Sequence, residues 1–327
     1  MRTISYSEVS DFLTCRKRWH YRYERILVPL SVAPELQLGT ATHYYLQHHI
    51  LENVFGVSNA TEGWLADYLK TNEPYSDDEY DELDRTNQLA EAIALRAVDY
   101  LGLRDGKWKP IFGPNEKPIV EFEGIAPIYR GKGFKFVSDW VAEDCNGNVW
   151  VIDHKTRKYL SEEDGSDLLQ LPLYQHAFQL IGIPVSGTIA FQMQSSLPSV
   201  PKLNKNGTMS RVKITSDWGT YEKALLENNL DPNDYLDMQP ELESNQFFKL
   251  VKTFRSETEH TQLWEGILIP LAREITKKDK PLHRNRSSFT CKRCAYRLLC
   301  EAELFDGDVD FIQECHYKLD PRKVNVT

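Results

Sequence analysis

The chain has 327 residues, a formal net charge of −9, 41% hydrophobic and 27% charged residues. This composition provides the core of one large domain or two ordinary ones. It shows no apolar leader at its start and no stretch of roughly 18 apolar residues that could span a membrane, so we expect a globular cytoplasmic protein without a membrane partner. The six cysteines are too few and too clustered for a disulfide scaffold and favour a metal or redox group.

The first predicted element is a short, basic helix. Ser5 stands three residues before Glu8, as in a capping box, and apolar residues then recur at helical spacing, so we predict a helix that carries Cys15. Aromatic residues alternate with arginines in its second half, which suits stacking on single-stranded nucleic acid, but packing in the core explains Trp19 equally well. The alternating residues are Arg16, Arg18, Trp19, Tyr21, Arg22, Tyr23 and Arg25.

The middle of the chain changes from helical to strand periodicity. Residues 41–55 and about 81–101 have helical patterns, and from about 118 to 155 the period becomes two. The later elements are a helix over about 167–180, strands in G-T-I-A-F-Q-M and F-F-K-L-V-K-T-F, a turn at Asn206-Gly207 before a strand in R-V-K-I, and a helix over about 256–277.

A carboxylate and a lysine stand together on one of these strands. Period two puts Asp153 and Lys155 on one face. Such a pair suits phosphodiester cleavage, because the carboxylate can hold a divalent ion while the ammonium orients or helps to deprotonate the attacking water. Asp139 on the preceding strand is the candidate for the second carboxylate.

The hairpin between these strands tests the hypothesis. With a two-residue loop, Asn146-Gly147, Asp139 would lie opposite His154 and point away from Asp153. With a three-residue loop, 145–147, and Gly147 in the left-handed conformation, Asp139 lies opposite Asp153. The metal hypothesis therefore predicts the three-residue loop.

Several motifs, in order, resemble one nuclease family. V-S-D-W followed by I-D-H-K-T is similar to motifs two and three of the PD-(D/E)XK nucleases, in their RecB-like branch. G-T-A-T-H, with Gly39 and His43, resembles the G-x-x-x-H motif, and Q-L-P-L-Y, with Gln170 and Tyr174, resembles the Q-x-x-x-Y motif. The fit of motif two is loose, since its usual glycine is here Gly133, six residues before the aspartate.

The resemblance implies a role for each matching residue. Lys155 activates the water, Gln170 lies near the metal-bound water or phosphate, and Tyr174 lies near the substrate backbone. Glu121, on the strand before the catalytic pair, is a further candidate carboxylate. The ligands of Mg²⁺ or Mn²⁺ would be His43, Asp139, Asp153 and the backbone carbonyl of His154.

Four cysteines form a second constellation at the two ends of the chain. They are Cys15, Cys291, Cys294 and Cys300, the last three spaced C-x2-C-x5-C. Such a group holds a metal or a cluster, and a zinc site completed locally by Cys315 or His316 is one alternative. The resemblance to iron–sulfur nucleases of this branch implies a four-thiolate [4Fe-4S] cluster that clasps the two ends together.

We therefore predict one α/β domain over residues 1–327, with a central mixed sheet flanked by helices, as in restriction endonucleases. It comprises an N-terminal clasp element (1–40), a helical region (41–115), a catalytic core (116–280) and a cysteine segment (281–327). The expected function is a metal-dependent DNA exonuclease acting on single strands or DNA ends, in recombination, repair or phage DNA processing. The alternative is a non-catalytic iron–sulfur DNA-binding subunit of a recombination or CRISPR-adaptation complex.

Overall fold

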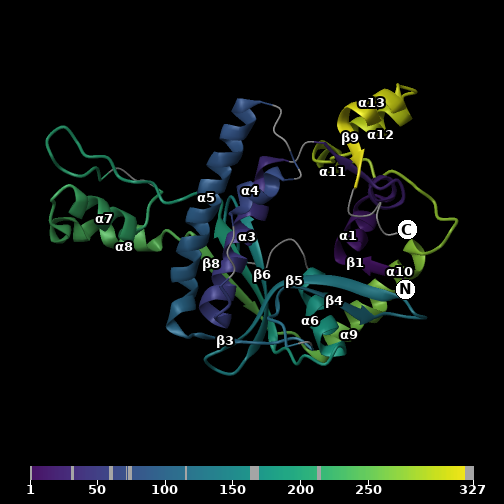
Figure 1. Ribbon diagram of the computed structural model, residues 1–327, viewed down its shortest axis with the longest axis horizontal. Helices are drawn as coiled ribbons and strands as arrows, with labels where there is room; N and C mark the ends of the chain where they lie inside the picture. The colour runs from purple at the N-terminus through teal and green to yellow at the C-terminus, as the bar shows by residue number, and fades with distance from the viewer. Residues whose placement is uncertain are drawn as a thin grey trace.

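The core of the molecule is a seven-stranded mixed sheet between two layers of helices (Figure 1). The computed structural model describes residues 2–30, 33–58, 62–70, 72, 76–114, 116–162, 169–211 and 215–320. The strands of the sheet are β1 (Thr3–Ser5), β3 (Trp108–Pro110), β4 (Val120–Pro127), β5 (Gly133–Asp144), β6 (Val149–Arg157), β7 (Gly187–Gln194) and β8 (Phe248–Thr253). The predicted α/β class and mixed sheet are confirmed.

The strands of the sheet are paired in both directions. The order is β1-β5-β6-β7-β8, with β3 and β4 pairing with the other edge of β5. The β5–β6 hairpin is antiparallel, whereas β6 and β7 are parallel and are joined through a helical crossover, α6 (Gln170–Leu180). β6 and β7 are buried on both faces along most of their length because helices cover both sides of them.

Two hydrophobic clusters hold the three layers together. On one face, α3 (Pro34–Phe55), α4 (Trp64–Leu69) and α5 (Asp77–Leu101) pack on the sheet around residues such as Leu46 and Ile152. On the other face lie α1 (Tyr6–Thr14), α6, α10 (Ile269–Ile275) and the π-helical turn η4 (Trp264–Leu268), packed around Phe136 and Phe178. α9 (Glu257–Leu263), η4 and α10 follow one another without a gap and together form the long helix predicted near 256–277.

The two ends of the chain meet in a small terminal unit, drawn in purple and yellow in Figure 1. It comprises α2 (Arg16–Trp19), η1 (His20–Glu24), α11 (Ser288–Lys292), α12 (Arg297–Leu304), α13 (Val309–His316) and the antiparallel pair β2 (Leu27–Pro29) and β9 (Tyr317–Leu319). Its core contains Tyr21, Tyr296 and Tyr317, and the Tyr296 hydroxyl donates to the carbonyl of Leu27 at 2.7 Å. Glu303 accepts ion pairs from Lys17 (2.5 Å), Arg25 (3.1 Å) and Arg284 (3.1 Å), so one carboxylate joins both ends.

One prediction for the N-terminal segment is wrong, and one open alternative is decided in favour of core packing. Cys15 does not lie within a helix; its backbone is extended (φ −166°, ψ 117°) and separates α1 from α2. No glycine or proline stands at this position to predict the break from the sequence. Trp19 and Tyr21 are fully buried, so they do not form a stacking platform. The arginines instead pair with acids of the same chain: Arg16 with Glu274, Arg18 and Arg22 with Asp11, and Arg25 with Glu303.

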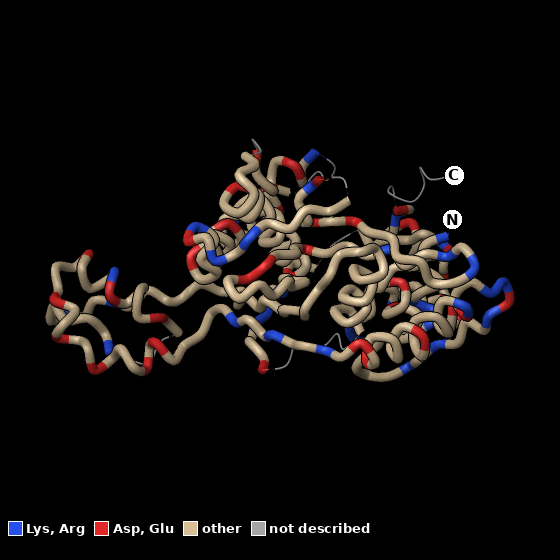
Figure 2. The backbone as a smooth tube through the Cα atoms, turned by 90° about the horizontal axis from the view of Figure 1, so that it is seen from below, with Lys and Arg blue, Asp and Glu red and all other residues tan. Residues whose placement is uncertain are grey.

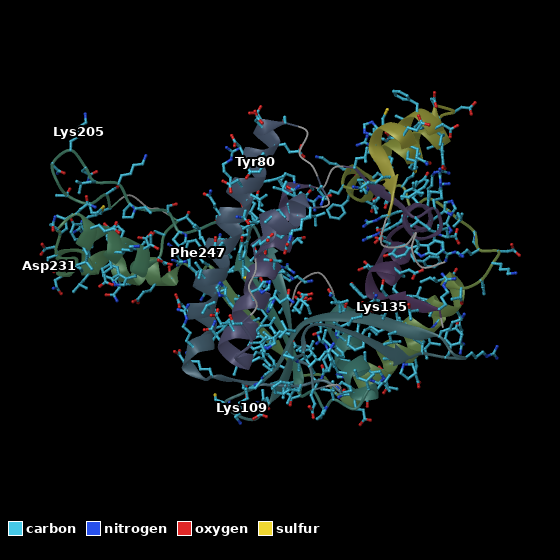
Figure 3. All side chains as sticks on the ribbon, viewed as in Figure 1. Tyr80, Lys109, Lys135, Lys205, Asp231 and Phe247 are labelled. Atoms are coloured by element: carbon cyan, nitrogen blue, oxygen red, sulfur yellow. The ribbon has the colours of Figure 1, made fainter. Side chains whose placement is uncertain are left out.

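A projecting arm was not anticipated from the sequence. It contains α7 (Trp218–Glu227), the 3-10 helix η3 (Pro232–Met238) and α8 (Gln239–Ser244), and Lys205 and Asp231 lie on it in Figure 3. The arm has its own small core around Tyr221 and Tyr235. Acidic residues predominate along it in Figure 2. The turn expected at Asn206-Gly207 is present, with φ +80° at Gly207.

Some expectations fall outside the described part of the chain. Residues 212–214 of the segment expected to be a strand, and residues 163–168 at the start of the helix expected near 167, lie outside it. The described part of that helix begins at Gln170. The short helix η2 (Leu103–Asp105) follows α5. Within the described residues, no helix is long and apolar enough to cross a membrane.

Candidate active site

The candidate site lies where β5 and β6 part. On the edge of β5 that faces β1 and β6, the ladder pairs β5 with β1 at residues 133–135 and with β6 at residues 140–143. Among the described residues, no ladder pair along that edge includes residues 136–139. Asp139 therefore lies at the edge of a gap in the sheet. In this gap the backbone N–H and C=O groups of the neighbouring strand need side chains as hydrogen-bond partners.

The β5–β6 hairpin has the predicted register. Trp140 pairs with Ile152, Glu143 pairs with Val149, and the Asp144 amide donates to the Asn148 carbonyl at 2.9 Å, which leaves a three-residue loop. Gly147 adopts the left-handed conformation at φ +81° that this loop requires. The same register, continued by one pair, places Asp139 opposite Asp153.

Asp139 replaces a backbone partner beyond the last pair of the hairpin. Its Oδ2 accepts a hydrogen bond from the backbone amide of His154 at 2.6 Å. The side chain of His154 is buried, and its Nδ1 lies 3.9 Å from the same carboxylate oxygen. This contact holds the Asp139 carboxylate against the strand that carries Asp153 and Lys155.

His43 reaches the gap from α3, which covers the face of the sheet opposite to α6. Pro34 occupies the first turn of α3, as its fixed φ favours, and Leu38, Thr42 and Leu46 are on the buried face of the helix. His43 Nε2 is 2.9 Å from the carbonyl oxygen of His154. Its Nδ1 is 3.7 Å from Asp139 Oδ2, so the histidine and the carboxylate converge from different elements.

Asp153, Lys155 and Gln170 form a closed triangle beside these groups. Lys155 Nζ lies 3.0 Å from Asp153 Oδ2 and donates to Gln170 Oε1 at 3.1 Å, and Gln170 Nε2 donates to Asp153 Oδ1 at 3.2 Å. Gln170 begins α6. The amide thus fixes the lysine and the carboxylate relative to each other.

Tyr174 lies one helical turn after Gln170 on α6, on the buried side of that residue. Its ring packs on Phe134, Phe136 and Tyr6, and its hydroxyl lies close to the side chain of Gln170. The side chain is only 7% exposed. The structure therefore places Tyr174 behind the triangle, within the core.

Burial and crowded charge perturb the ionisation of the site. Burial, followed by the charge of Asp139, raises the pKa of Asp153 to about 6, and burial also raises the pKa of Asp139. For His43, burial favours the neutral ring, but the charges of Asp139 and neighbouring carboxylates outweigh it and raise its pKa to about 9. Burial holds the pKa of His154 well below its usual range. Like charges forced together in a buried site are characteristic of sites that bind a cation.

The donor atoms have the spacing that a small divalent cation requires. Among the described residues, one group of three or more His, Cys, Asp or Glu side chains brings its ligand atoms within 4.8 Å of one another: His43, Asp139 and His154, the last through a ring nitrogen, while its backbone carbonyl is a further donor. The 2.9 Å between His43 Nε2 and the His154 carbonyl matches neighbouring corners of an octahedron with ligand bonds of about 2.1 Å, which are roughly 3 Å apart. Carboxylate, carbonyl and imidazole donors suit Mg²⁺ or Mn²⁺. The residues therefore fit a divalent metal site.

Comparison with known proteins agrees with this geometry. The family model of the PD-(D/E)XK nuclease superfamily matches residues 3–301. The chain belongs to the PD-(D/E)XK nuclease superfamily. Membership indicates a metal-dependent nuclease with DNA as its substrate, and the mixed sheet flanked by helices is consistent with the restriction-endonuclease-like fold.

The other comparisons add no functional argument about this PD-(D/E)XK nuclease. No curated protein matches its sequence. A solved structure described as the crystal structure of SSO0001 matches at 15% identity, covering 81% of this chain and 97% of that chain, with a TM-score of 0.27. At that TM-score the likeness supports no conclusion about fold or function.

Glu121 is a further carboxylate in the site of this PD-(D/E)XK nuclease. The flanking pairs Val120–Trp140 and Phe122–Ser138 put it across from Asp139 on β4. Its backbone has φ +48°, which is rare for a residue with a side chain and is typical of functional sites. Its Oε1 lies 3.9 Å from His43 Nδ1. The sequence predicted Glu121 as a further candidate carboxylate, but the alternation of residues along a strand does not predict its backbone conformation.

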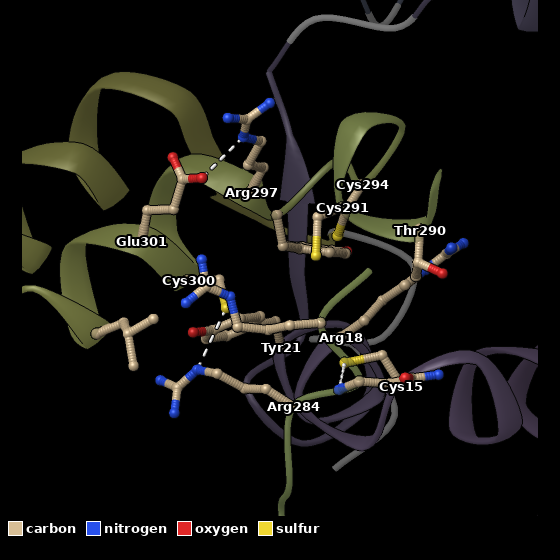
Figure 4. Close-up of a pocket in the computed structure, with 14 residues that line it drawn as sticks. Cys15, Arg18, Tyr21, Arg284, Thr290, Cys291, Cys294, Arg297, Cys300 and Glu301 are labelled. Atoms are coloured by element: carbon tan, nitrogen blue, oxygen red, sulfur yellow. Dashed lines mark hydrogen bonds and ion pairs between the residues drawn. The ribbon is translucent and has the colours of Figure 1, made fainter. Parts of the chain in front are cut away.

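The four cysteines of the PD-(D/E)XK nuclease line one cavity of about 50 Å³ in the terminal unit (Figure 4). Arg284 Nε lies 3.3 Å from Cys300 Sγ, and the backbone amide of Asn285 lies 3.5 Å from Cys15 Sγ. Donors aimed at sulfur suit thiolates rather than thiols. Cys145 and Cys315 are exposed elsewhere, and the cysteine cavity does not include the residues of the nuclease site.

Proposed function

We propose that this protein is a metal-dependent DNA exonuclease that acts on single strands or DNA ends, in recombination, repair or phage DNA processing. The observation that carries the proposal is the convergence of His43 and Asp139 on the backbone of His154, where His43 meets the carbonyl and Asp139 meets the amide, beside the Asp153–Lys155 pair. These groups come from α3, β5 and β6, and they match the motifs of the RecB-like branch in order. The proposed metal ligands are His43, Asp139, Asp153 and the His154 carbonyl.

The residues divide the work of hydrolysis. A bound Mg²⁺ or Mn²⁺ would polarise the phosphate and lower the pKa of water. Lys155 orients the attacking water and takes part in its deprotonation, since its Nζ is already fixed by Asp153 at 3.0 Å and Gln170 at 3.1 Å. Tyr174 acts as a positioning residue, because its hydroxyl lies close to Gln170 and its ring is buried.

An exposed aromatic residue supports a single-stranded substrate. Tyr159 follows the end of β6 and is 72% exposed, and the ammonium of Lys158 lies 5.4 Å from its ring centroid. A ring beside a cation is the arrangement that stacks bases without regard to sequence. The strand that carries Asp153 and Lys155 therefore leads directly to a surface suited to a single strand.

Digestion of defined DNA tests the function. We expect Mn²⁺-dependent loss of label from end-labelled linear single strands and no loss in EDTA. Circular single strands of the same sequence are the matched control and should stay intact, because an exonuclease needs an end. Equal cutting of circles and linear strands would show an endonuclease, and no cutting of either would favour the non-catalytic DNA-binding alternative.

We also propose that the four cysteines hold a [4Fe-4S] cluster. A single zinc ion with Zn–S bonds of about 2.3 Å would need thiolates roughly 3.8 Å apart. The thiols of the described chain form no group of three within 4.8 Å. A cluster, whose irons separate the thiolates further, suits this spacing better. Protein purified without oxygen should be brown and bleach on reduction; a colourless sample with one bound zinc would contradict the proposal.

Glu121 should orient the metal-binding histidine. Metal-bound histidines commonly donate their second ring N–H to a carboxylate, and loss of that partner costs about 10- to 100-fold in metal affinity. His43 Nδ1 faces Glu121 Oε1 at 3.9 Å while Nε2 faces the His154 carbonyl. We expect Glu121→Ala to weaken Mn²⁺ binding, measured by calorimetry, by that factor.

Two variants make this measurement specific. Glu121→Gln keeps an acceptor oxygen and should retain most of the affinity. Glu123→Ala removes a carboxylate on the same strand that pairs with Lys135 at 2.7 Å, and it should leave Mn²⁺ affinity unchanged. If Glu121→Ala and Glu123→Ala bind Mn²⁺ equally well, the orienting role is wrong.

A further inference from the structure

A cavity opens beside the candidate site on the side of α3. Its volume is about 610 Å³, within the range of about 300–1,000 Å³ for small-molecule sites. Its walls come from α3, α4, β4 and β6, and His43 and Lys155 are part of them. Whatever occupies this space therefore lies against the groups proposed to carry out cleavage.

Few cationic side chains line the cavity away from the candidate site. Phosphates are held by lysine and arginine, and the one lysine or arginine among the described residues that line the cavity is Lys155. Two carboxylates, Glu35 and Glu121, also line it. Away from His43 and Lys155, the walls therefore favour an uncharged group over an anion.

The remaining walls have the chemistry of a base-binding site. Tyr44 contributes aromatic surface, Trp64 contributes only an edge because it is 4% exposed, and Gln47 contributes an amide that can pair with the edge of a base. Leu36, at the rim, is 65% exposed although it is apolar. Aromatic and apolar surface beside a single amide is suited to a planar, partly polar ring.

We propose that this cavity receives one nucleobase of the DNA strand, that of the nucleotide next to the phosphate being cut. The proposal rests on the proposed nuclease function, since Lys155 and His43 fix where that phosphate lies. Gly39 offers a position for testing this: it lies on α3 in the cavity wall, and a Cβ built on it would meet no atom within 4 Å. A large side chain at this position would project into the unfilled volume.

The experiment combines base deletion in the DNA with filling of the cavity. The probes are single-stranded oligonucleotides with an abasic residue at each position in turn, bound in Ca²⁺ and checked on a gel for integrity. In the parent, the abasic residue at one position should weaken binding about tenfold, the effect of losing one stacked base. Gly39→Phe should remove the penalty at that position, and Gly39→Ala should preserve it.

A second variant guards against misfolding of Gly39→Phe. Gln47→Leu keeps the size of the side chain and removes the amide, and it should reduce the same positional penalty. If the parent binds and cuts single strands but no position depends on its base, the pocket is wrong and the nuclease function stands. If Gly39→Phe and Gln47→Leu both fold and both keep the parent's profile, the pocket is wrong as well. If the parent neither binds nor cuts single strands, both proposals fail.

Discussion

Replacing Lys155 with alanine is expected to lower the rate of single-strand cleavage by about 10²- to 10⁴-fold, the usual contribution of a positioned acid–base group. Lys155 is the one cation of the triangle that joins Asp153 and Gln170, at 3.0 and 3.1 Å. The substitution removes the ammonium that faces the reacting water and leaves His43 and Asp139 in place. The measurement is the single-turnover rate with saturating Mn²⁺.

Lys135→Ala is the matched control for this prediction. Lys135 is also a strand lysine, on β5, and its Nζ pairs with Glu123 at 2.7 Å on an exposed face. Its loss should change the rate by less than about threefold, as for most surface substitutions. Calorimetry should show that Lys155→Ala still binds Mn²⁺. A Lys155→Ala rate within threefold of the parent rate would remove Lys155 from the mechanism.

Cys294→Ser is expected to have the largest effect on stability, with a loss of more than about 4 kcal/mol, as is typical when a metal or cluster ligand is lost. The terminal unit has a small core around Tyr21 and Tyr296, too small to hold the two ends of the chain firmly by itself. Unfolding should be followed by denaturant titration without oxygen, together with the visible absorption of the sample.

The exposed cysteines provide the comparison. Cys315→Ser and Cys145→Ser change exposed thiols outside the cysteine cavity and should shift stability by no more than about 0.5 kcal/mol. Folded Cys294→Ser molecules should still bind Mn²⁺ at the nuclease site, because that site shares no residue with the cysteine cavity. Equal stability of Cys294→Ser and Cys315→Ser would contradict the clasp.

The sequence was most informative where local geometry decides the outcome. The spacing around Gly147 allowed two loops, and the metal hypothesis selected the three-residue loop that brings Asp139 opposite Asp153, which is the register of the structure. Period and capping also predicted α1, α3, α5 and the core strands. The G-x-x-x-H and Q-x-x-x-Y spacings pointed to the residues that now surround the gap in the sheet.

Features that depend on contacts between residues far apart in the chain could not be predicted from the sequence. The buried position of Tyr21 depends on Tyr296 and Tyr317, more than 100 residues away, and alternation with arginine does not encode it. The break at Cys15 is followed directly by two good helix formers, Arg16 and Lys17. The arm folds around its own small core, which has no sharp change in composition at its boundaries. The left-handed backbone of Glu121 depends on packing against β5.

The joining of the chain's two ends by Glu303 has a consequence for synthesis on the ribosome. Arg25 and Glu303 are 278 positions apart, so at 5–20 residues per second the N-terminal segment waits roughly 15 to 55 s for its partner. During that time Tyr21, which the terminal unit later buries completely, has no core to enter. The nascent chain therefore exposes a basic, aromatic segment until the segment around Glu303 has been made, and this is the interval in which a chaperone would have to protect it.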